Sequence, residues 1–229
     1  MGQPLAPLPE DFGATVASLH RVAEAIVAPA RKPDNEISLR ATPGGFGTPE
    51  FDHAGARDRV RVEGDELVRE TAGAQTRAPL GSLAAAAALV ADLLPGGAPA
   101  DEPLTVGREA ALALGRWYAF GEACLARLRD EASVAEGATH PLLWPEHFDI
   151  AIELGDEAAG RRATFGFSPG DENHAEPYVY VAPWAPQPAG ERWNARGFAG
   201  AELGYAELLA GGDPEFDALR FLRDRRDAL

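Results

Sequence analysis

The chain has 229 residues, of which 45% are hydrophobic and 25% are charged, a composition that allows a full hydrophobic core. Its formal charge of -15 disfavours binding to nucleic acids or to anionic membranes, because such binding rests on cationic side chains. No apolar run is long enough to cross a membrane, and Met1–Glu10 lacks the basic start and apolar stretch of a secretory signal, so we expect a soluble cytoplasmic protein.

The first part of the chain combines a helix with short strands. Apolar residues recur at helical spacing over 11–28, whereas those over 36–41 alternate with polar residues as in a strand. The segment 42–49 is rich in glycine and proline, which predicts a turn, and Phe46 and Phe51 can continue strand pairing around it. Gly64-Asp65 separates two short strand-like runs, 59–62 and 66–70, and therefore predicts a hairpin.

Two helices follow in the middle of the chain. The first is predicted over 82–94 with Ser82 as its N-cap, and a loop at 95–103 separates it from the second. The second helix is predicted over 105–131 and is apolar around most of its circumference, which indicates burial on more than one side. It contains Cys124, the only cysteine, which we interpret as a buried hydrophobic residue rather than a nucleophile.

The C-terminal third begins with strands and ends with helices. Alternation of apolar and polar residues predicts strands at 148–153, 164–167 and 178–181. A short helix is expected over 203–209. A last helix is expected to begin at Asp213-Pro214, because proline suits the first turn of a helix.

The order of these elements predicts the fold class. Helices and hairpins come in blocks without regular βαβ alternation, which is typical of α+β proteins. We therefore predict an antiparallel or mixed sheet packed with about five helices. The whole chain, 1–229, is expected to form a single domain with a flexible N-terminus at 1–10.

Aromatic residues gather in the C-terminal third and suggest a first hypothesis for function. Tyr178 and Tyr180 lie on the same face of their predicted strand, while Trp144 and Trp184 stand at strand ends. Such residues can fill a core, or they can line an apolar pocket that has a few polar groups. The first hypothesis is a non-catalytic module that uses these four residues to bind a small molecule or to interact with a partner.

Two pairs of polar residues suggest a second hypothesis, a metal-dependent hydrolase-like enzyme. His147 and Asp149 are spaced to point to one side of a strand, and His174 and Glu176 share that spacing. If their strands lie in one sheet, two imidazoles and two carboxylates would suit zinc, iron or manganese. The alternative places His174 in a solvated acidic loop and His147 in packing at the start of a strand.

Other interpretations remain open. Carboxylates of the same region can form a paired acid–base site without metal, and the chain can equally be structural or oligomer-forming. The glycine clusters match neither a dinucleotide-binding fingerprint nor a P-loop, so the sequence specifies neither a cofactor nor an enzyme class. The carboxylates in question are Glu146, Asp149, Glu153, Asp171, Glu172 and Glu176.

The order of several short strings resembles an uncharacterised bacterial domain-of-unknown-function family. Its pattern is a T-L-H helix, an F-W-x-x-F-D-L-A-V strand, G-F-W-P-G, and an F-Y-S-Y-A-Y-P strand. The chain departs from it at Ser168, where the pattern has an aromatic residue. The resemblance implies a bacterial α+β protein whose motifs concentrate in the C-terminal half, and it implies no activity. The matching strings are Ser18-Leu19-His20, Leu143-Trp144, Phe148-Asp149-Ile150-Ala151-Ile152, Gly166-Phe167-Ser168-Pro169-Gly170 and Tyr178-Val179-Tyr180-Val181-Ala182-Pro183.

Overall fold

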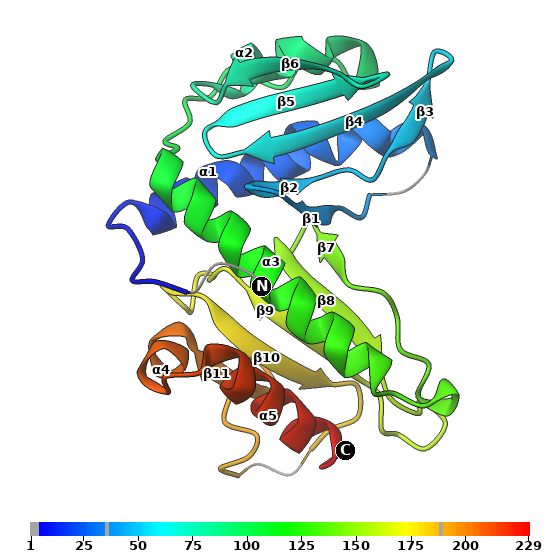
Figure 1. Ribbon diagram of the computed structural model, residues 1–229, viewed down its shortest axis with the longest axis vertical. Coiled ribbons are helices and arrows are strands. Elements are labelled where there is room, and N and C mark those ends of the chain that lie inside the picture. Colours follow the sequence, from blue (N-terminus) through cyan, green and yellow to red (C-terminus); the bar gives the residue numbers. More distant parts are fainter. Residues whose placement is uncertain (1–4, 35–36, 188–189) are drawn as a thin grey trace. The chain divides into compact units, whose positions relative to one another are not determined.

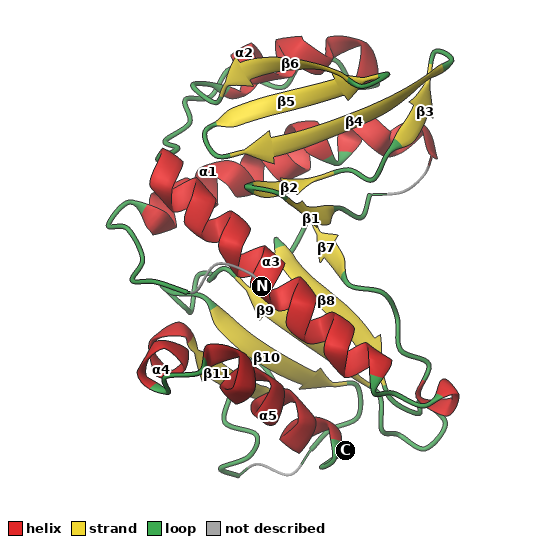
Figure 2. Ribbon diagram, viewed as in Figure 1, coloured by secondary structure: helices red, strands yellow, loops and turns green. Residues whose placement is uncertain are grey.

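The computed structural model describes residues 5–34, 37–187 and 190–229. Within these residues the protein has five α-helices and two antiparallel sheets, so the predicted α+β class is confirmed (Figure 2). None of the described helices is both long and apolar enough to cross a membrane. Of the segment 1–10, which was expected to be flexible, residues 1–4 lie outside the described residues.

The chain divides into two compact units, which we describe separately. The N-terminal unit comprises Leu8–Ala119 and Leu143–Phe148. The C-terminal unit comprises Phe120–Leu142, Asp149–Leu229 and the described part of Met1–Pro7. Helix α3 (Arg108–Asp130) is one continuous helix that supplies residues to both units. The single domain over 1–229 stays a prediction.

The N-terminal unit is built around a six-stranded sheet with the order β1-β2-β4-β5-β6, in which β3 also pairs with β4 (Figure 1). Helix α1 continues into a π-helical turn before the sheet, and helix α2 continues into a 3-10 segment after it. The elements are α1 (Phe12–Val22), the π turn (Ala23–Val27), a 3-10 turn (Pro29–Asp34), β1 (Arg40–Thr42), β2 (Gly45–Gly47), β3 (Phe51–His53), β4 (Ala56–Glu63), β5 (Glu66–Thr71), β6 (Ala74–Pro79), α2 (Leu83–Ala87) and the 3-10 segment (Ala88–Leu93).

The two faces of this sheet differ in polarity. Val60, Val62 and Leu67 are each at most 1% exposed. Side chains alternate along a strand, and the register pairs Val62 with Leu67, so these residues share one buried face. Arg59 and Arg61 alternate with them on β4 and therefore lie on the opposite face.

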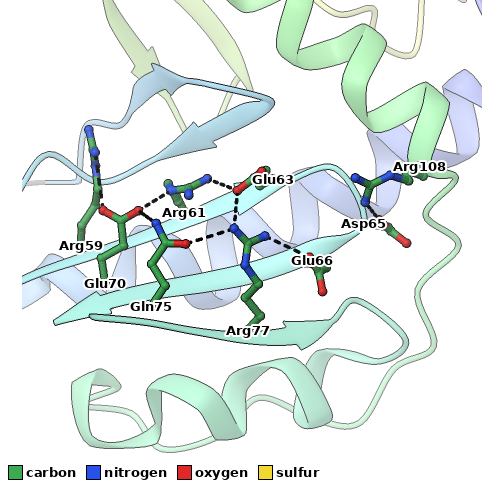
Figure 3. A network of polar contacts seen from close by, with 9 residues as sticks. All are labelled: Arg59, Arg61, Glu63, Asp65, Glu66, Glu70, Gln75, Arg77 and Arg108. Atoms are coloured by element: carbon green, nitrogen blue, oxygen red, sulfur yellow. Dashed lines mark hydrogen bonds and ion pairs between the residues drawn. The ribbon is translucent and has the colours of Figure 1, made fainter. Parts of the chain in front are cut away.

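That opposite face carries a network of paired charges (Figure 3). Arg61 donates to Glu63 (2.8 Å) and Glu70 (2.9 Å), and Arg77 donates to Glu63 (2.9 Å) and Glu66 (3.0 Å). The hydrogen bond from Arg61 is the main reason that the pKa of Glu63 is lowered. Arg59 also pairs with Glu70 (3.7 Å), so three arginines share three glutamates and the charges of this network balance.

The C-terminal unit is built on the second sheet, whose strand order is β11-β10-β9-β8-β7. Helix α3 precedes these strands in the chain, and two further helices follow them (Figure 1). The elements are a 3-10 turn (Val134–Glu136), β8 (Asp149–Leu154), β9 (Ala163–Ser168), β10 (Tyr178–Pro183), β11 (Ala201–Gly204), α4 (Tyr205–Ala210) and α5 (Pro214–Arg226). Of strand β7 (Leu142–Trp144), only Leu142 belongs to this unit, because Leu143 and Trp144 belong to the N-terminal unit.

Helices α3 and α5 cover one face of this sheet. Gly121 of α3 lies so close to the sheet that a Cβ atom there would stand 2.8 Å from the Phe167 ring and 3.1 Å from Ile150. Arg127 of α3 forms an ion pair with Glu215 of α5, so the two helices lie side by side (Figure 1). The opposite face of the sheet is therefore the one free of these helices.

Most of the predicted elements are confirmed with shifted ends. The first helix begins at Phe12 and ends in the π turn, and the hairpin about Gly64-Asp65 joins β4 to β5. Ser82 caps α2, since its hydroxyl accepts the amide of Ala85 at 3.3 Å. Residues 95–102 form neither helix nor strand.

Two predictions near the N-terminus are confirmed only in part. The strand expected over 36–41, of which Glu36 lies outside the described residues, is confined to Arg40–Thr42. The turn predicted over 42–49 is confined to residues 43–44, and Phe46 and Phe51 continue the strand pairing in β2 and β3. A Cβ atom on Gly45 would stand 2.3 Å from the carbonyl oxygen of Val62 on β4, so this glycine permits close strand pairing rather than a turn.

Four strands have no clear sequence signal: β3, β6, β7 and β11. Strand β6 lies at the edge of its sheet and is mostly exposed, so its residues do not alternate in polarity. Strands β3, β7 and β11 have only three or four residues each, which is too short for a periodic pattern.

Candidate binding face of the C-terminal unit

The helix-free face of the C-terminal sheet carries mostly polar and aromatic side chains. Phe167 points toward α3, so Gly166 and Ser168 point to the other face of β9. The register pairs Tyr178 with Ser168 and Tyr180 with Gly166, which places both tyrosines on that face. We call this side of the sheet the aromatic face. Its strand residues include Asp149, Glu153, Thr164, Gly166, Ser168, Tyr178, Tyr180 and Glu202.

Tyr180 crosses strand β9 at Gly166 to reach Asp149 on β8. A Cβ atom on residue 166 would stand 2.4 Å from the Tyr180 ring, so only glycine leaves room for it. The Tyr180 hydroxyl donates to Asp149 Oδ2, and Asp149 is only 6% exposed. Burial and the charge of Asp149 raise the pKa of Tyr180 well above its ordinary value, so the hydroxyl stays protonated.

Tyr178 is held by the loop 169–177, which joins β9 to β10. Its hydroxyl donates to Asp171 Oδ2 at 2.6 Å. Burial and this hydrogen bond raise the pKa of Tyr178, so it too remains a neutral donor. The Tyr178 residue is 8% exposed, and its ring lies against the imidazole of His174 with 4.1 Å between the ring centroids.

Both ring nitrogens of His174 contact carboxylates. Nδ1 lies 2.9 Å from Asp171 Oδ1, and Nε2 lies 3.0 Å from Glu202 Oε2 on β11. Burial favours the neutral imidazole, but the two carboxylates outweigh it and raise the pKa of His174. Burial would also raise the pKa of Asp171, but hydrogen bonds from Tyr178 and His174 lower it overall.

Phe198, between β10 and β11, completes an aromatic cluster with the two tyrosines. Its ring centroid lies 6.4 Å from that of Tyr178 and 6.0 Å from that of Tyr180. The two tyrosine rings are themselves 6.0 Å apart. These distances are typical of interacting aromatic pairs, so the three rings form one packed group.

The other end of the aromatic face has a different character. Trp184 is 54% exposed, and the guanidinium of Arg162 lies 5.1 Å from its ring centroid. The Thr164 hydroxyl donates to Glu153 Oε1 at 2.9 Å. Burial raises the pKa of Glu153, and the hydrogen bond from Thr164 opposes this shift only in part. This end therefore combines an exposed indole with a half-buried carboxylate.

The structure brings together two of the four residues predicted to bind a ligand. Tyr178 and Tyr180 are neighbours on the aromatic face. Trp184 lies directly after the same strand, where its backbone amide bonds to the Arg162 carbonyl at 2.9 Å. Trp144 belongs to the N-terminal unit.

The strand argument for His147 and Asp149 is wrong. Strand β8 begins at Asp149, and His147 is an exposed residue in the turn before it. Phe148, between them, has a φ of 53°, which interrupts the extended backbone that the argument needs. This conformation is held in the N-terminal unit. The Phe148 carbonyl accepts a hydrogen bond from Tyr118 at 2.7 Å, and its ring stacks on His20 at 4.9 Å.

Two of the three remaining predicted metal ligands, Asp149 and His174, have other partners. Asp149 accepts the hydroxyl of Tyr180, His174 lies between two carboxylates, and Glu176 is exposed. Across residues 5–34, 37–187 and 190–229, no group of three or more His, Cys, Asp or Glu could hold a metal ion. The metal site therefore stays a prediction that the contacts of these described residues do not support.

The sequence gives no signal for Phe198 and Glu202, which complete the face. Phe198 lies in a glycine-rich segment outside any strand, and Glu202 lies in the four-residue strand β11. Asp171 has only the general signal of an acidic loop. Its role depends on the conformation of loop 169–177, which brings Asp171 next to Tyr178, and the sequence does not indicate that conformation.

Cys124 is a buried residue, as its apolar surroundings in the sequence predict. It is 0% exposed in helix α3, and burial raises the pKa of its thiol to about 12. The thiol is therefore protonated at neutral pH and is not a nucleophile.

Comparison of the chain with protein-family models, with curated proteins and with solved structures gave no match. The resemblance to the uncharacterised bacterial family accordingly stays a prediction.

Proposed function

We propose that the protein is a binding module whose aromatic face takes a small ligand that carries a positive charge. The observation that supports this best is the pairing of Tyr178 and Tyr180 on one sheet face, with each hydroxyl bonded to a carboxylate. Rings held in this way are fixed before a ligand arrives, which reduces the entropy that binding would otherwise cost.

The charges near the rings favour a cation. Asp149, Asp171 and Glu202 lie around the two tyrosines and His174. Negative charges of this kind add to the attraction that the faces of aromatic rings exert on ammonium or guanidinium groups. The formal charge of -15 has the same sign and would steer a cation toward the protein.

The same contacts argue for binding rather than for nucleophilic catalysis. The pKa values of Tyr178 and Tyr180 are raised, so neither supplies a phenolate at neutral pH. Both nitrogens of His174 are bonded to carboxylates, which leaves it unsuited to act as a general base. Cys124 is buried and protonated.

Two small molecules that differ only in charge test the proposal. Choline and its uncharged isostere 3,3-dimethylbutan-1-ol have nearly the same shape, and calorimetric titration gives the affinity of each. We expect choline to bind about tenfold more tightly, because a partly desolvated cation–π contact contributes roughly 1–2 kcal/mol. Equal affinities would sink the proposal.

Matched variants locate the site. Phe198→Leu keeps an apolar side chain but removes a ring of the cluster, and should weaken choline binding about tenfold. Phe216→Leu makes the same change at an exposed phenylalanine of α5 and should leave binding unchanged. Retention of full affinity by Phe198→Leu would place the site elsewhere.

The metal-dependent hydrolase is the second hypothesis. It requires one metal ion per chain that is lost on His147→Ala, which native mass spectrometry of protein purified without chelators would detect. The same spectrum reports the oligomeric state and so tests the alternative that the protein has a structural or oligomer-forming role.

We further infer that the protein acts in the cytoplasm and that its acidic charge disfavours nucleic acids as partners.

A further inference from the structure

We propose that His174 is a pH-sensitive latch that joins loop 169–177 to strand β11 when its imidazole is protonated and releases the loop when it is neutral. The latch lies at the edge of the aromatic face, over the ring of Tyr178. The inference goes beyond the proposed function and needs no ligand. Only its consequence, pH-dependent access to the face, rests on the binding proposal.

The hydrogen-bond geometry requires a charged imidazole. Both ring nitrogens lie within 3.0 Å of carboxylate oxygens, Nδ1 from Asp171 and Nε2 from Glu202. Ionised carboxylates only accept hydrogen bonds, whereas a neutral imidazole has one N–H group. A neutral His174 would therefore direct a nitrogen lone pair at one of the carboxylates, and that contact would become repulsive.

The contact with Glu202 is the one expected to break. Asp171 is only three residues from His174, and the turn between them has its own hydrogen bonds. Asp171 Oδ1 accepts the amides of Asn173 (2.7 Å) and His174 (3.0 Å). Glu202, by contrast, is 28 residues away on another strand, so its bond to Nε2 is the one that joins the loop to the sheet.

Acidic side chains surround the latch on its own loop and on β11. Its own loop contributes Asp171 and the exposed Glu172 and Glu176, β11 contributes Glu202, and β10 contributes the neutral Tyr178. The main-chain amide of Arg196 donates to the same Glu202 oxygen at 3.1 Å. The side chain of Arg196 is positively charged and is the cation nearest to Glu202 in the sequence. Breaking the latch would therefore loosen both the loop and the segment before β11.

The sign of the pH dependence follows from the pKa of His174, which is raised above the ordinary 6.5. The latch contributes its full stability below that ordinary value and loses it as the pH rises through the raised pKa. The lowered pKa of Asp171 sets the acidic limit, because stability from its carboxylate is lost only as the pH falls through that lowered value.

Two measurements on the full chain test the latch. NMR of the histidine ring nitrogens should give His174 a higher pKa in the folded protein than in the chain unfolded by urea. Hydrogen exchange followed by mass spectrometry should detect the release of loop 169–177. After correction for the intrinsic pH dependence of exchange, the rate in peptides that cover this loop should rise up to roughly tenfold per pH unit above that pKa.

Variants separate the latch from general destabilisation. Glu202→Gln keeps the size of the side chain but removes the charge, and should lower the pKa of His174 and flatten the pH dependence of loop exchange. His174→Gln has no titrating group and should also give a flat profile. His147→Gln, at an exposed histidine, should keep the wild-type profile.

Two results would overturn the latch. One is a folded-state pKa of His174 at or below its value in urea. The other is a pH profile of loop exchange that Glu202→Gln leaves unchanged. Either result leaves the binding proposal standing, because choline binding is measured separately.

Discussion

At the scale of the residue, Gly166 determines where Tyr180 lies. A Cβ atom at this position would overlap the Tyr180 ring at 2.4 Å, so Gly166→Ala forces the ring away from Asp149. We predict a loss of about 1–3 kcal/mol in the free energy of unfolding, measured by chemical denaturation. Gly81→Ala serves as the control, because no atom lies within 4 Å of the Cβ that it adds, and should change stability by less than about 0.5 kcal/mol. An equally small effect of Gly166→Ala would contradict the described position of Tyr180.

The sequence predicts only part of the aromatic face. Tyr178 and Tyr180 could be placed together because side chains two apart share a strand face. The partners that fix them come from a loop, from the preceding strands and from a segment some 20 residues later, and no local periodicity encodes such contacts. His147 illustrates the reverse error, since its spacing from Asp149 suits a strand but Phe148 breaks the strand with a positive φ.

At the scale of the element, helix α3 depends on glycine where it meets the N-terminal sheet. A Cβ atom on Gly115 would stand 2.6 Å from the amide nitrogen of Gly45 and 2.7 Å from the carbonyl carbon of Gly44. Alanine normally stabilises a helix by about 0.5–1 kcal/mol relative to glycine. We nevertheless predict that Gly115→Ala lowers the free energy of unfolding by about 1–3 kcal/mol, because backbone atoms cannot move aside as a side chain can.

Gly13 of helix α1 provides the matched control for this prediction. It is exposed, and a Cβ atom there would meet nothing within 4 Å. Gly13→Ala should therefore raise the free energy of unfolding by up to about 1 kcal/mol. If both substitutions stabilise the protein in thermal and chemical denaturation, the close packing of α3 on β1 and β2 is wrong.

The elements that sequence predicts well are those with local signals. Helix α1 and helix α3 have many apolar residues at helical spacing, and the β4–β5 hairpin has a Gly-Asp turn. Strand β6 lacks such a signal because it lies at an edge and pairs on one side only. Strand β2 is hard to recognise in the sequence because its glycines permit close strand pairing, whereas glycines in a sequence usually indicate a turn.

At the scale of the whole molecule, the continuity of α3 bears on the prediction of a single domain. Residues of the helix before Phe120 belong to the N-terminal unit and those from Phe120 onward belong to the C-terminal unit. Unfolding of either unit would remove support from part of a helix that the other unit needs. We therefore predict one cooperative transition in scanning calorimetry, with equal calorimetric and van 't Hoff enthalpies. Two separated transitions would mean that the units fold independently.

The central claim is that the aromatic face binds a cation, and an NMR titration that locates binding tests it most directly. Choline and 3,3-dimethylbutan-1-ol are added in turn to the full chain with ring signals assigned for Tyr178, Tyr180 and Phe198. We predict that choline shifts these three signals at concentrations at which its uncharged isostere does not, while the signals of Phe216 are unaffected. Shifts confined to other residues, or identical shifts with both compounds, would contradict it.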